Sequence, residues 1–226
     1  MGNKYNLMNQ LTFTFPFKKR YYEQDFYVSS NNFSAYRLIE SWPNWPGKWV
    51  NIYGPNGCGK THLSNILKKK INLVNILDAA SINNETISKI EKLDCLIIDN
   101  YNSNIDENIF YSILNQLKQL DRYIVINSSL PIQDFKYNLI DLKSRADSFI
   151  SLAIELPTDD LLRVIISKSF SDKQIKISPN ISEYIIKNIE RSYEKVFKFI
   201  KEIDDLSLSS GKSININLIK KVLTNE

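Results

Sequence analysis

The stretch Gly54-Pro55-Asn56-Gly57-Cys58-Gly59-Lys60-Thr61 decides the fold, because it matches the phosphate-loop pattern G-x-x-x-x-G-K-[ST]. Glycines let the backbone close around phosphate groups, and successive N–H groups and the start of the following helix bind the anion. The chain has 6 glycines, and three of them lie in this octapeptide. The alternative is an ordinary glycine turn that caps a helix, and the strand and helix expected around the loop disfavour it.

The residue types in the loop predict contacts with a nucleotide. Lys60 is expected to reach the β- and γ-phosphates, and the Thr61 hydroxyl is expected to hold Mg²⁺. A helix N-terminus can lower the pKa of a thiol, but Cys58 is interpreted as a small residue that the loop tolerates. The expected cofactor is ADP or ATP with Mg²⁺, and the expected contacts are Gly54, Gly57, Cys58, Gly59, Lys60 and Thr61.

Apolar strands and helical stretches alternate on both sides of the loop. Residues 49–53 are typical of the strand before it, and residues 61–70 of the helix after it. Residues 95–98 are apolar on both faces, as buried parallel strands are. Further strands are expected at 73–77, 123–126 and 149–156, and helices at 30–41, 85–92 and 107–120. The alternation predicts an α/β fold with a parallel five-stranded sheet covered on both sides.

The strand pattern ends at Pro157. Helical periodicity at 161–170, 181–189, 196–206 and 216–223 predicts a small all-α domain after it. We therefore expect three parts: an N-terminal arm (residues 1–20), an α/β nucleotide-binding domain (21–157) and a helical domain (158–226).

Composition restricts the class of protein. With 43% hydrophobic and 24% charged residues, the chain is typical of a folded globular protein. No uncharged apolar run approaches the roughly 18 residues of a membrane-spanning helix, and the N-terminus lacks the apolar core of a signal peptide. Two cysteines cannot form a disulfide framework, and a single histidine disfavours a histidine-based metal site. We expect a cytoplasmic protein without a membrane partner.

An acidic residue that could bind magnesium is expected at the end of a central strand. Leu96-Ile97-Ile98-Asp99 is an apolar strand that ends in an acid, and Asp99 is expected to bind Mg²⁺ through water. In hydrolytic P-loop ATPases another acid commonly follows and positions the attacking water, whereas here Asn100 follows. An amide orients water but cannot take its proton, so weak or absent intrinsic hydrolysis is expected.

Polar residues also end the next strand, in the sequence Asn127-Ser128-Ser129. The carboxyl ends of strands in open α/β sheets face the ligand crevice. Asn127 is the first candidate for sensing a γ-phosphate, and Ser129 is the second. The alternative is that these residues simply begin a loop.

These features resemble AAA+ ATPases, specifically the DnaA-related group that includes the Hda-type regulatory inactivators, over nearly the whole chain. The segment Asp25-Phe26-Tyr27-Val28, followed by Asn32 and Ala35, resembles the segment that approaches adenine in this group. The resemblance implies that Phe26, Tyr27 and Val28 contact the base. Leu142-Lys143-Ser144-Arg145 resembles the segment that carries an arginine finger, which implies that Arg145 acts in trans.

The resemblance extends into the helical domain, with one departure. Glu155-Leu156-Pro157 resembles the passage into the helical lid of the group. The lid arginine that senses nucleotide in this group would fall near Glu194. Lys195 and Arg191 are the candidates to replace it, and each could equally be a solvated charge on a helix.

The N-terminal arm contains Gln10-Leu11-Thr12-Phe13-Thr14-Phe15, which is similar to the sliding-clamp-binding peptide of the Hda-type proteins. Gln10 would provide a polar anchor, while Leu11, Phe13 and Phe15 would enter an apolar pocket as an extended peptide. The alternative is an edge strand folded onto the protein's own core.

The resemblance implies negative control of replication initiation. The DNA polymerase sliding clamp and DnaA are the expected partners, a second copy of the chain is a further candidate, and DNA would be reached mainly through the clamp, with a nucleoid-associated location. Docked on the DNA-loaded clamp, the protein would promote hydrolysis of DnaA-bound ATP through Arg145. Sequence-specific origin binding is not expected, because the chain ends at Glu226 without a helix-turn-helix segment after the lid.

Two other classes stay open at the level of the sequence. A replication loader or remodeller would itself hydrolyse ATP. A clamp-tethered DNA-binding adaptor would use basic residues on phosphates, and the candidates are Lys18, Lys19, Arg20 and residues 68–70.

Overall fold

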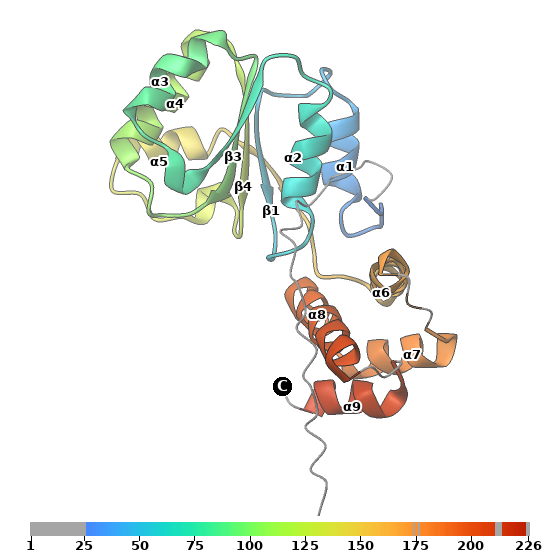
Figure 1. The fold of residues 1–226 in the computed structure, drawn as a ribbon. Helices are drawn as coiled ribbons and strands as arrows, with labels where there is room; N and C mark the ends of the chain where they lie inside the picture. The colour runs from blue at the N-terminus through green and yellow to red at the C-terminus, as the bar shows by residue number, and fades with distance from the viewer. Residues whose placement is uncertain (1–25, 174, 176, 211–213, 225–226) are drawn as a thin grey trace, which may run out of the picture. The chain divides into compact units, whose positions relative to one another are not determined.

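The computed structural model describes residues 26–173, 175, 177–210 and 214–224 (Figure 1). Contacts divide these residues into two compact units, one ending at Pro157 and the other beginning at Thr158. The predictions for the arm, including Gln10, fall outside the described residues. No helix among the described residues combines the length and the apolar character that crossing a membrane requires.

The first unit is built on a five-stranded sheet in which every strand pair is parallel. The strands are β1 (Trp49–Tyr53), β2 (Val74–Asp78), β3 (Cys95–Tyr101), β4 (Tyr123–Ser128) and β5 (Ile150–Ala153), in the spatial order β2-β3-β4-β1-β5. Parallel strands end at the same edge, so the ends of β1, β3 and β4 bring Tyr53, Asp99 and Asn127 to one side of the sheet. The predicted α/β fold with a parallel five-stranded sheet is confirmed.

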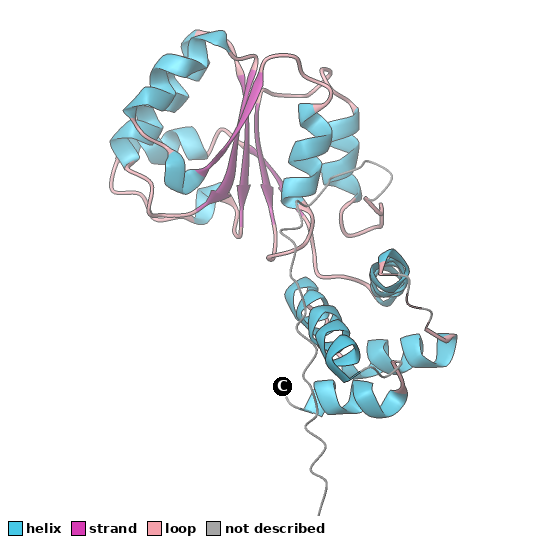
Figure 2. Ribbon diagram, in the orientation of Figure 1, coloured by secondary structure: helices cyan, strands magenta, loops and turns pink. Residues whose placement is uncertain are grey.

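Helices cover both faces of the sheet (Figures 1 and 2). One face carries α1 (Phe33–Glu40) and α2 (Lys60–Lys68), and the other carries α3 (Asn84–Lys89), α4 (Glu107–Gln119) and α5 (Ile140–Ala146). Single 3₁₀ turns add Ala79–Ser81, Ile90–Lys92 and Ile132–Asp134. The start of α4 is fixed by Asp106, whose carboxylate accepts the N–H groups of Asn108 and Ile109.

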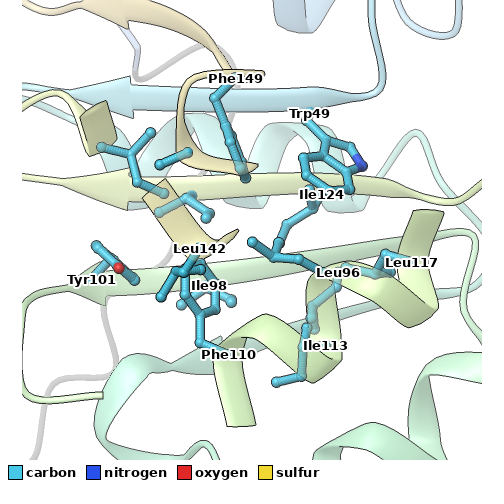
Figure 3. Packing of buried hydrophobic residues seen from close by; sticks show 14 of the residues in the cluster. Trp49, Leu96, Ile98, Tyr101, Phe110, Ile113, Leu117, Ile124, Leu142 and Phe149 are labelled. Carbon is cyan, nitrogen blue, oxygen red and sulfur yellow. The ribbon is translucent and has the colours of Figure 1, made fainter. Parts of the chain in front are cut away.

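An apolar core fills the space between the sheet and helices α4 and α5 (Figure 3). Its side chains alternate along the strands and recur every three or four positions along α4, as the two periodicities require. The core includes Trp49, Leu96, Ile98 and Ile124 from the sheet, Phe110, Ile113 and Leu117 from α4, and Leu142 from α5. Burial of each such side chain contributes about 1.5–3 kcal/mol, which holds α5 against the sheet.

The second unit is entirely helical in its described residues. It contains α6 (Asp159–Asp172), α7 (Pro179–Asn188), α8 (Tyr193–Ser210) and α9 (Ile216–Thr224), which share their own apolar core around Phe170 and Phe199. Hydroxyl caps fix two starts, since Thr158 accepts the N–H of Leu161 and Ser178 that of Ile181. The helical character predicted after Pro157 is confirmed.

A buried amide connects three strands on the face of the core. Asn51 in β1 is fully buried, and its Nδ2 donates to the Ile126 carbonyl at 2.9 Å and to Ser128 Oγ at 2.8 Å. Its Oδ1 accepts the backbone N–H of Ile132 at 2.8 Å and the hydroxyl of Ser151 at 3.3 Å. The side chain therefore has a partner for each donor and for its acceptor, which fixes β4, β5 and the 3₁₀ turn around β1.

We predict that Asn51→Ala destabilises this unit by about 2–4 kcal/mol, because it leaves the buried N–H of Ile132 and the Ile126 carbonyl without their side-chain partner. The measurement is urea unfolding followed by tryptophan fluorescence, since all three tryptophans lie in this unit. Asn75→Ala on the edge strand β2 is the matched control and should change stability by less than about 1 kcal/mol. Equal effects of the two substitutions would contradict the structural role of Asn51.

Candidate nucleotide-binding site

The phosphate loop joins β1 to α2 and adopts a conformation that depends on glycine. Gly54, Gly57 and Gly59 have φ values of 155°, 80° and 105°. Gly59 is the N-cap residue of α2 in a left-handed conformation, and no described side chain caps the helix. The first N–H groups of α2 are therefore available to an anion, which a phosphate would satisfy.

Two of these glycines also lie against neighbouring atoms. A Cβ on Gly54 would be 2.3 Å from the backbone oxygen of Ile154, which follows β5. A Cβ on Gly59 would be 2.9 Å from Cε2 of Phe26, the far edge of an aromatic ring. The first contact is with rigid backbone and the second with a side chain that can turn aside, so the loop is held more tightly at its beginning than at its end.

Lys60 and Cys58 lie on the inner side of the loop. The Lys60 ammonium donates to the carbonyls of Gly54 at 2.7 Å and Pro55 at 3.0 Å, so it follows the curve that phosphates would occupy. The Cys58 thiol is buried 3.8 Å from the Lys60 nitrogen, and burial raises its pKa despite the neighbouring ammonium. Cys58 is therefore protonated at neutral pH, and its side chain packs inside the loop.

Thr61 and Asp99 form the pair that fits a magnesium ion. The Thr61 hydroxyl donates to Asp99 Oδ2 at 2.7 Å, which leaves the lone pairs of the hydroxyl oxygen for a cation. Asp99 is 8% exposed and also accepts the N–H of Asn100 on Oδ1 at 3.2 Å. Hydroxyl and carboxylate oxygens suit Mg²⁺. The described residues contain no cluster of three potential metal-ligating side chains, so nucleotide phosphates and water would have to complete the coordination.

Asn127 lies beside Asp99 on the face of the sheet that α2 covers. Its Nδ2 donates to Asp99 Oδ1 at 2.9 Å and to Ser64 Oγ at 2.8 Å, and all three side chains are buried. The carbonyl oxygen of the amide is also buried, with no hydrogen-bond partner among the described residues. Ser64 was not singled out from the sequence. Its only signal there is a hydroxyl on the apolar stripe of the helix, between Leu63 and Ile66.

The side chains of the other two predicted polar residues, Asn100 and Ser129, are not hydrogen-bonded to Asp99 or Asn127. Asn100 has a left-handed backbone (φ 58°), and its exposed amide donates to Asp78 Oδ2 at 2.6 Å. This hydrogen bond lowers the pKa of Asp78. Ser129 is exposed, whereas the preceding Ser128 is buried and bonded to Asn51. The amide of Asn100 is therefore engaged at the edge of the sheet, on β2.

The predicted adenine segment packs against the loop through Phe26. The Phe26 ring stacks on Tyr36, with centroids 5.7 Å apart, and meets His62 edge-on at 5.4 Å. Tyr27 is 47% exposed and its carbonyl accepts the amide of Asn32, while Val28 is half-buried. Phe26 is thus the member of this segment that touches the phosphate loop directly.

The predicted arginine finger lies on the other face of the sheet. Arg145 is half-buried on α5, and its Nη2 donates to Asn115 Oδ1 on α4 at 2.9 Å. Of the other described arginines, Arg122, Arg163 and Arg191 each pair with a carboxylate, whereas the exposed Arg37 pairs with none of a described residue. Arg145 pairs with no carboxylate of a described residue, so its charge is held by a neutral amide alone.

The candidate lid residues differ in their partners. Arg191 forms two hydrogen bonds with Asp159, at 2.9 and 3.1 Å, so its guanidinium is engaged within the helical unit. Lys195 on α8 is half-buried, and its ammonium contacts no acid among the described residues. Of the two, Lys195 is the one whose charge has no acidic partner among the described residues.

The fold and the site define the chain as a P-loop protein with the AAA+ fold. The crystal structure of domain III of the Thermotoga maritima replication initiation protein DnaA matches with a TM-score of 0.75 at 19% identity, and the match covers 93% of this chain and 98% of that one. AMPPCP-bound DnaA from Aquifex aeolicus matches with a TM-score of 0.68 at 24% identity over 81% and 65% of the two chains.

The sequence is also similar to those of curated DnaA proteins. The chromosomal replication initiator protein DnaA of Borrelia garinii subsp. bavariensis is 28% identical over 262 residues, which cover 92% of this chain and 54% of the relative. The chain therefore spans about half the length of the curated relatives that it matches. A family model described as RNA helicase matches residues 50–136, which include the phosphate loop, Asp99 and Asn127.

The two glycine contacts lead to a prediction about the loop. Gly54→Ala should destabilise the α/β unit by about 3 kcal/mol or more, because the new methyl group meets a backbone carbonyl. Gly59→Ala should cost only about 1–3 kcal/mol, since the Phe26 ring can move and only the backbone strain remains. Urea unfolding monitored by tryptophan fluorescence compares the two variants. A larger effect at Gly59 would show that the loop is not held against Ile154.

Proposed function

We propose that this protein binds an adenine nucleotide with Mg²⁺ and acts as a negative regulator of replication initiation, promoting hydrolysis of DnaA-bound ATP through Arg145. The observation that carries the proposal is the guanidinium of Arg145, which is half-buried and bonded to the neutral Asn115 without a carboxylate partner among the described residues. A cation that no neighbouring acid neutralises is suited to an anion on another molecule.

Nucleotide binding is supported by the loop geometry and by the Thr61–Asp99 pair. The backbone groups at the start of α2 would hold the phosphates, and Lys60 would leave the two carbonyls that it now contacts to reach them. Thr61 and Asp99 would hold Mg²⁺, which supplies charge neutralisation for the phosphates.

Weak turnover of this bound nucleotide is supported by the residue next to Asp99 in the chain. Asn100 cannot take a proton from water, and its amide is engaged with Asp78. The described side chains around Asp99 include no second carboxylate bonded to the same group. The nucleotide in the chain's own pocket would therefore be structural or regulatory, and an ATP-hydrolysing loader is the less supported function.

Action in trans is supported by the position of Arg145. It lies on α5, across the sheet from α2 and its phosphate loop (Figure 1). An arginine finger stabilises the charge of the transition state and supplies about 10³–10⁵ in rate. The proposed clamp contact through Gln10, Leu11, Phe13 and Phe15 is supported by the sequence resemblance alone, since these residues lie outside the described ranges.

Lys60→Ala should weaken the binding of ADP and ATP at least about 10-fold, because a charge-assisted contact with phosphate is lost. Removal of Mg²⁺ by a chelator should also weaken ATP binding. Titration with a fluorescent nucleotide measures both effects. The exposed Lys68 at the end of the same helix provides the control, and Lys68→Ala should leave the affinity within about twofold. Identical effects of the two lysine substitutions would argue against the phosphate site.

The trans activity is tested on DnaA loaded with ATP, in the presence of a DNA-loaded clamp. The wild type should accelerate hydrolysis, and Arg145→Ala should return the rate to that of DnaA alone. Lys143→Ala on the same helix is the control and should retain stimulation. Gln10→Ala should also lose the stimulation that depends on the clamp.

Each other outcome has a defined meaning. Stimulation that survives Arg145→Ala would remove the proposed mechanism. No stimulation by a folded, nucleotide-bound wild type would contradict the regulator, and intrinsic turnover abolished by Lys60→Ala would then favour the loader. Affinity for duplex DNA without the clamp, falling steeply with salt, would favour the DNA-binding adaptor.

A further inference from the structure

Ser64 accepts a hydrogen bond from the side-chain amide of Asn127. Asn127 has two N–H donors on its amide nitrogen, and that nitrogen has two acceptors, Asp99 Oδ1 at 2.9 Å and Ser64 Oγ at 2.8 Å. Both donors are used within the protein. The hydroxyl of Ser64 is what engages the second one.

The orientation of this amide follows from chemistry. A carboxylate only accepts hydrogen bonds, so the nitrogen of the Asn127 amide, and not its oxygen, must face Asp99. The amide oxygen then lies away from Asp99 and remains buried with no partner among the described residues. In this state the side-chain amide of Asn127 can still accept a hydrogen bond from a ligand but cannot donate one.

A γ-phosphate requires the opposite capacity. Phosphate oxygens at neutral pH accept hydrogen bonds, so a side chain that distinguishes ATP from ADP at this position must donate one. We infer that Ser64 is a positioning residue that holds Asn127 in a state unable to donate to a γ-phosphate, so that the pocket binds ADP and ATP with similar affinity. The inference rests on the proposed nucleotide site and specifies how that site is regulated.

The chain offers a matched comparison on the opposite face of the sheet. Ser128 Oγ accepts a hydrogen bond from Nδ2 of Asn51 at 2.8 Å. Both residues are buried, as Ser64 and Asn127 are. Consecutive residues of a strand point to opposite faces, so the Ser128 bond faces away from the Asn127 amide. Loss of either hydroxyl removes one buried bond to an asparagine amide, but only Ser64→Ala releases a donor beside Asp99.

The test measures dissociation constants for ADP and for a non-hydrolysable ATP analogue, both with Mg²⁺, on the full chain. The wild type should bind the two nucleotides within about threefold of one another. Ser64→Ala should raise affinity for the ATP analogue relative to ADP by about 10-fold, the effect of one hydrogen bond to a charged group. Ser128→Ala should leave the ratio as in the wild type. The double variant Ser64→Ala/Asn127→Ala should lose the gain.

The ratio of the two affinities separates positioning from a loss of structure, because a loosened pocket weakens both nucleotides together. If Ser64→Ala does not fold, as judged by tryptophan fluorescence, Ser64→Cys takes its place, since a thiol leaves no cavity, is only slightly larger than the hydroxyl and is a weak acceptor. An unchanged ratio in the folded Ser64 variant, or a wild type that strongly prefers ATP, would overturn the inference and leave the proposed function standing. Absence of any nucleotide binding by folded wild type would overturn the proposed function itself, together with the inference.

Discussion

The carboxylate of Asp99 is the group on which the candidate nucleotide site depends. It accepts the Thr61 hydroxyl from α2, the Asn127 amide from β4 and the backbone N–H of Asn100. A buried carboxylate without such donors would be costly, and here each donor comes from a different part of the unit. The same bonds that satisfy Asp99 therefore fix the register between helix and strands. They also leave Thr61 able to bind a cation, because its hydroxyl proton is donated to Asp99 and the lone pairs of its oxygen remain available.

Two asparagine–serine pairs on opposite faces of the sheet show how a site differs from a structural polar core. The amide of Asn51 has partners on both its nitrogen and its oxygen, so it has nothing left to offer a ligand and acts only to join strands. The nitrogen of the Asn127 amide has hydrogen-bond partners, whereas its buried oxygen has none in the part of the chain that the structure describes. Such an unpaired buried acceptor is tolerated where a ligand or water completes it. Both residues are buried, so they differ in whether the amide can still accept a hydrogen bond from a ligand.

The sequence predicts the features that depend on local spacing. The phosphate loop, Asp99 at the end of β3 and Asn127 at the end of β4 are found from patterns of a few residues, and the parallel sheet is indicated by alternating strands and helices. Contacts between distant elements leave no such pattern: Ser64 reads as an isolated hydroxyl on an apolar helix face, and Asn115 as one polar residue on α4. Helix α5 was also missed, because its seven residues are too few for helical periodicity to be distinguished from a loop. Its packing through Leu142 against the sheet is what stabilises it.

Charge balance links the two halves of the proposed mechanism. Around the phosphate loop, the Lys60 ammonium has only uncharged partners and the start of α2 has no side-chain cap among the described residues, so this part of the unit favours an anion that stays bound. Across the sheet, Arg145 is held by Asn115, which orients a guanidinium without neutralising it. A carboxylate at position 115 would satisfy the same geometry but would cancel the charge that a transition state requires. In the proposed mechanism, the neutral partner of Arg145 would therefore keep the guanidinium available for another molecule's phosphate, which an ion pair between the two helices would not.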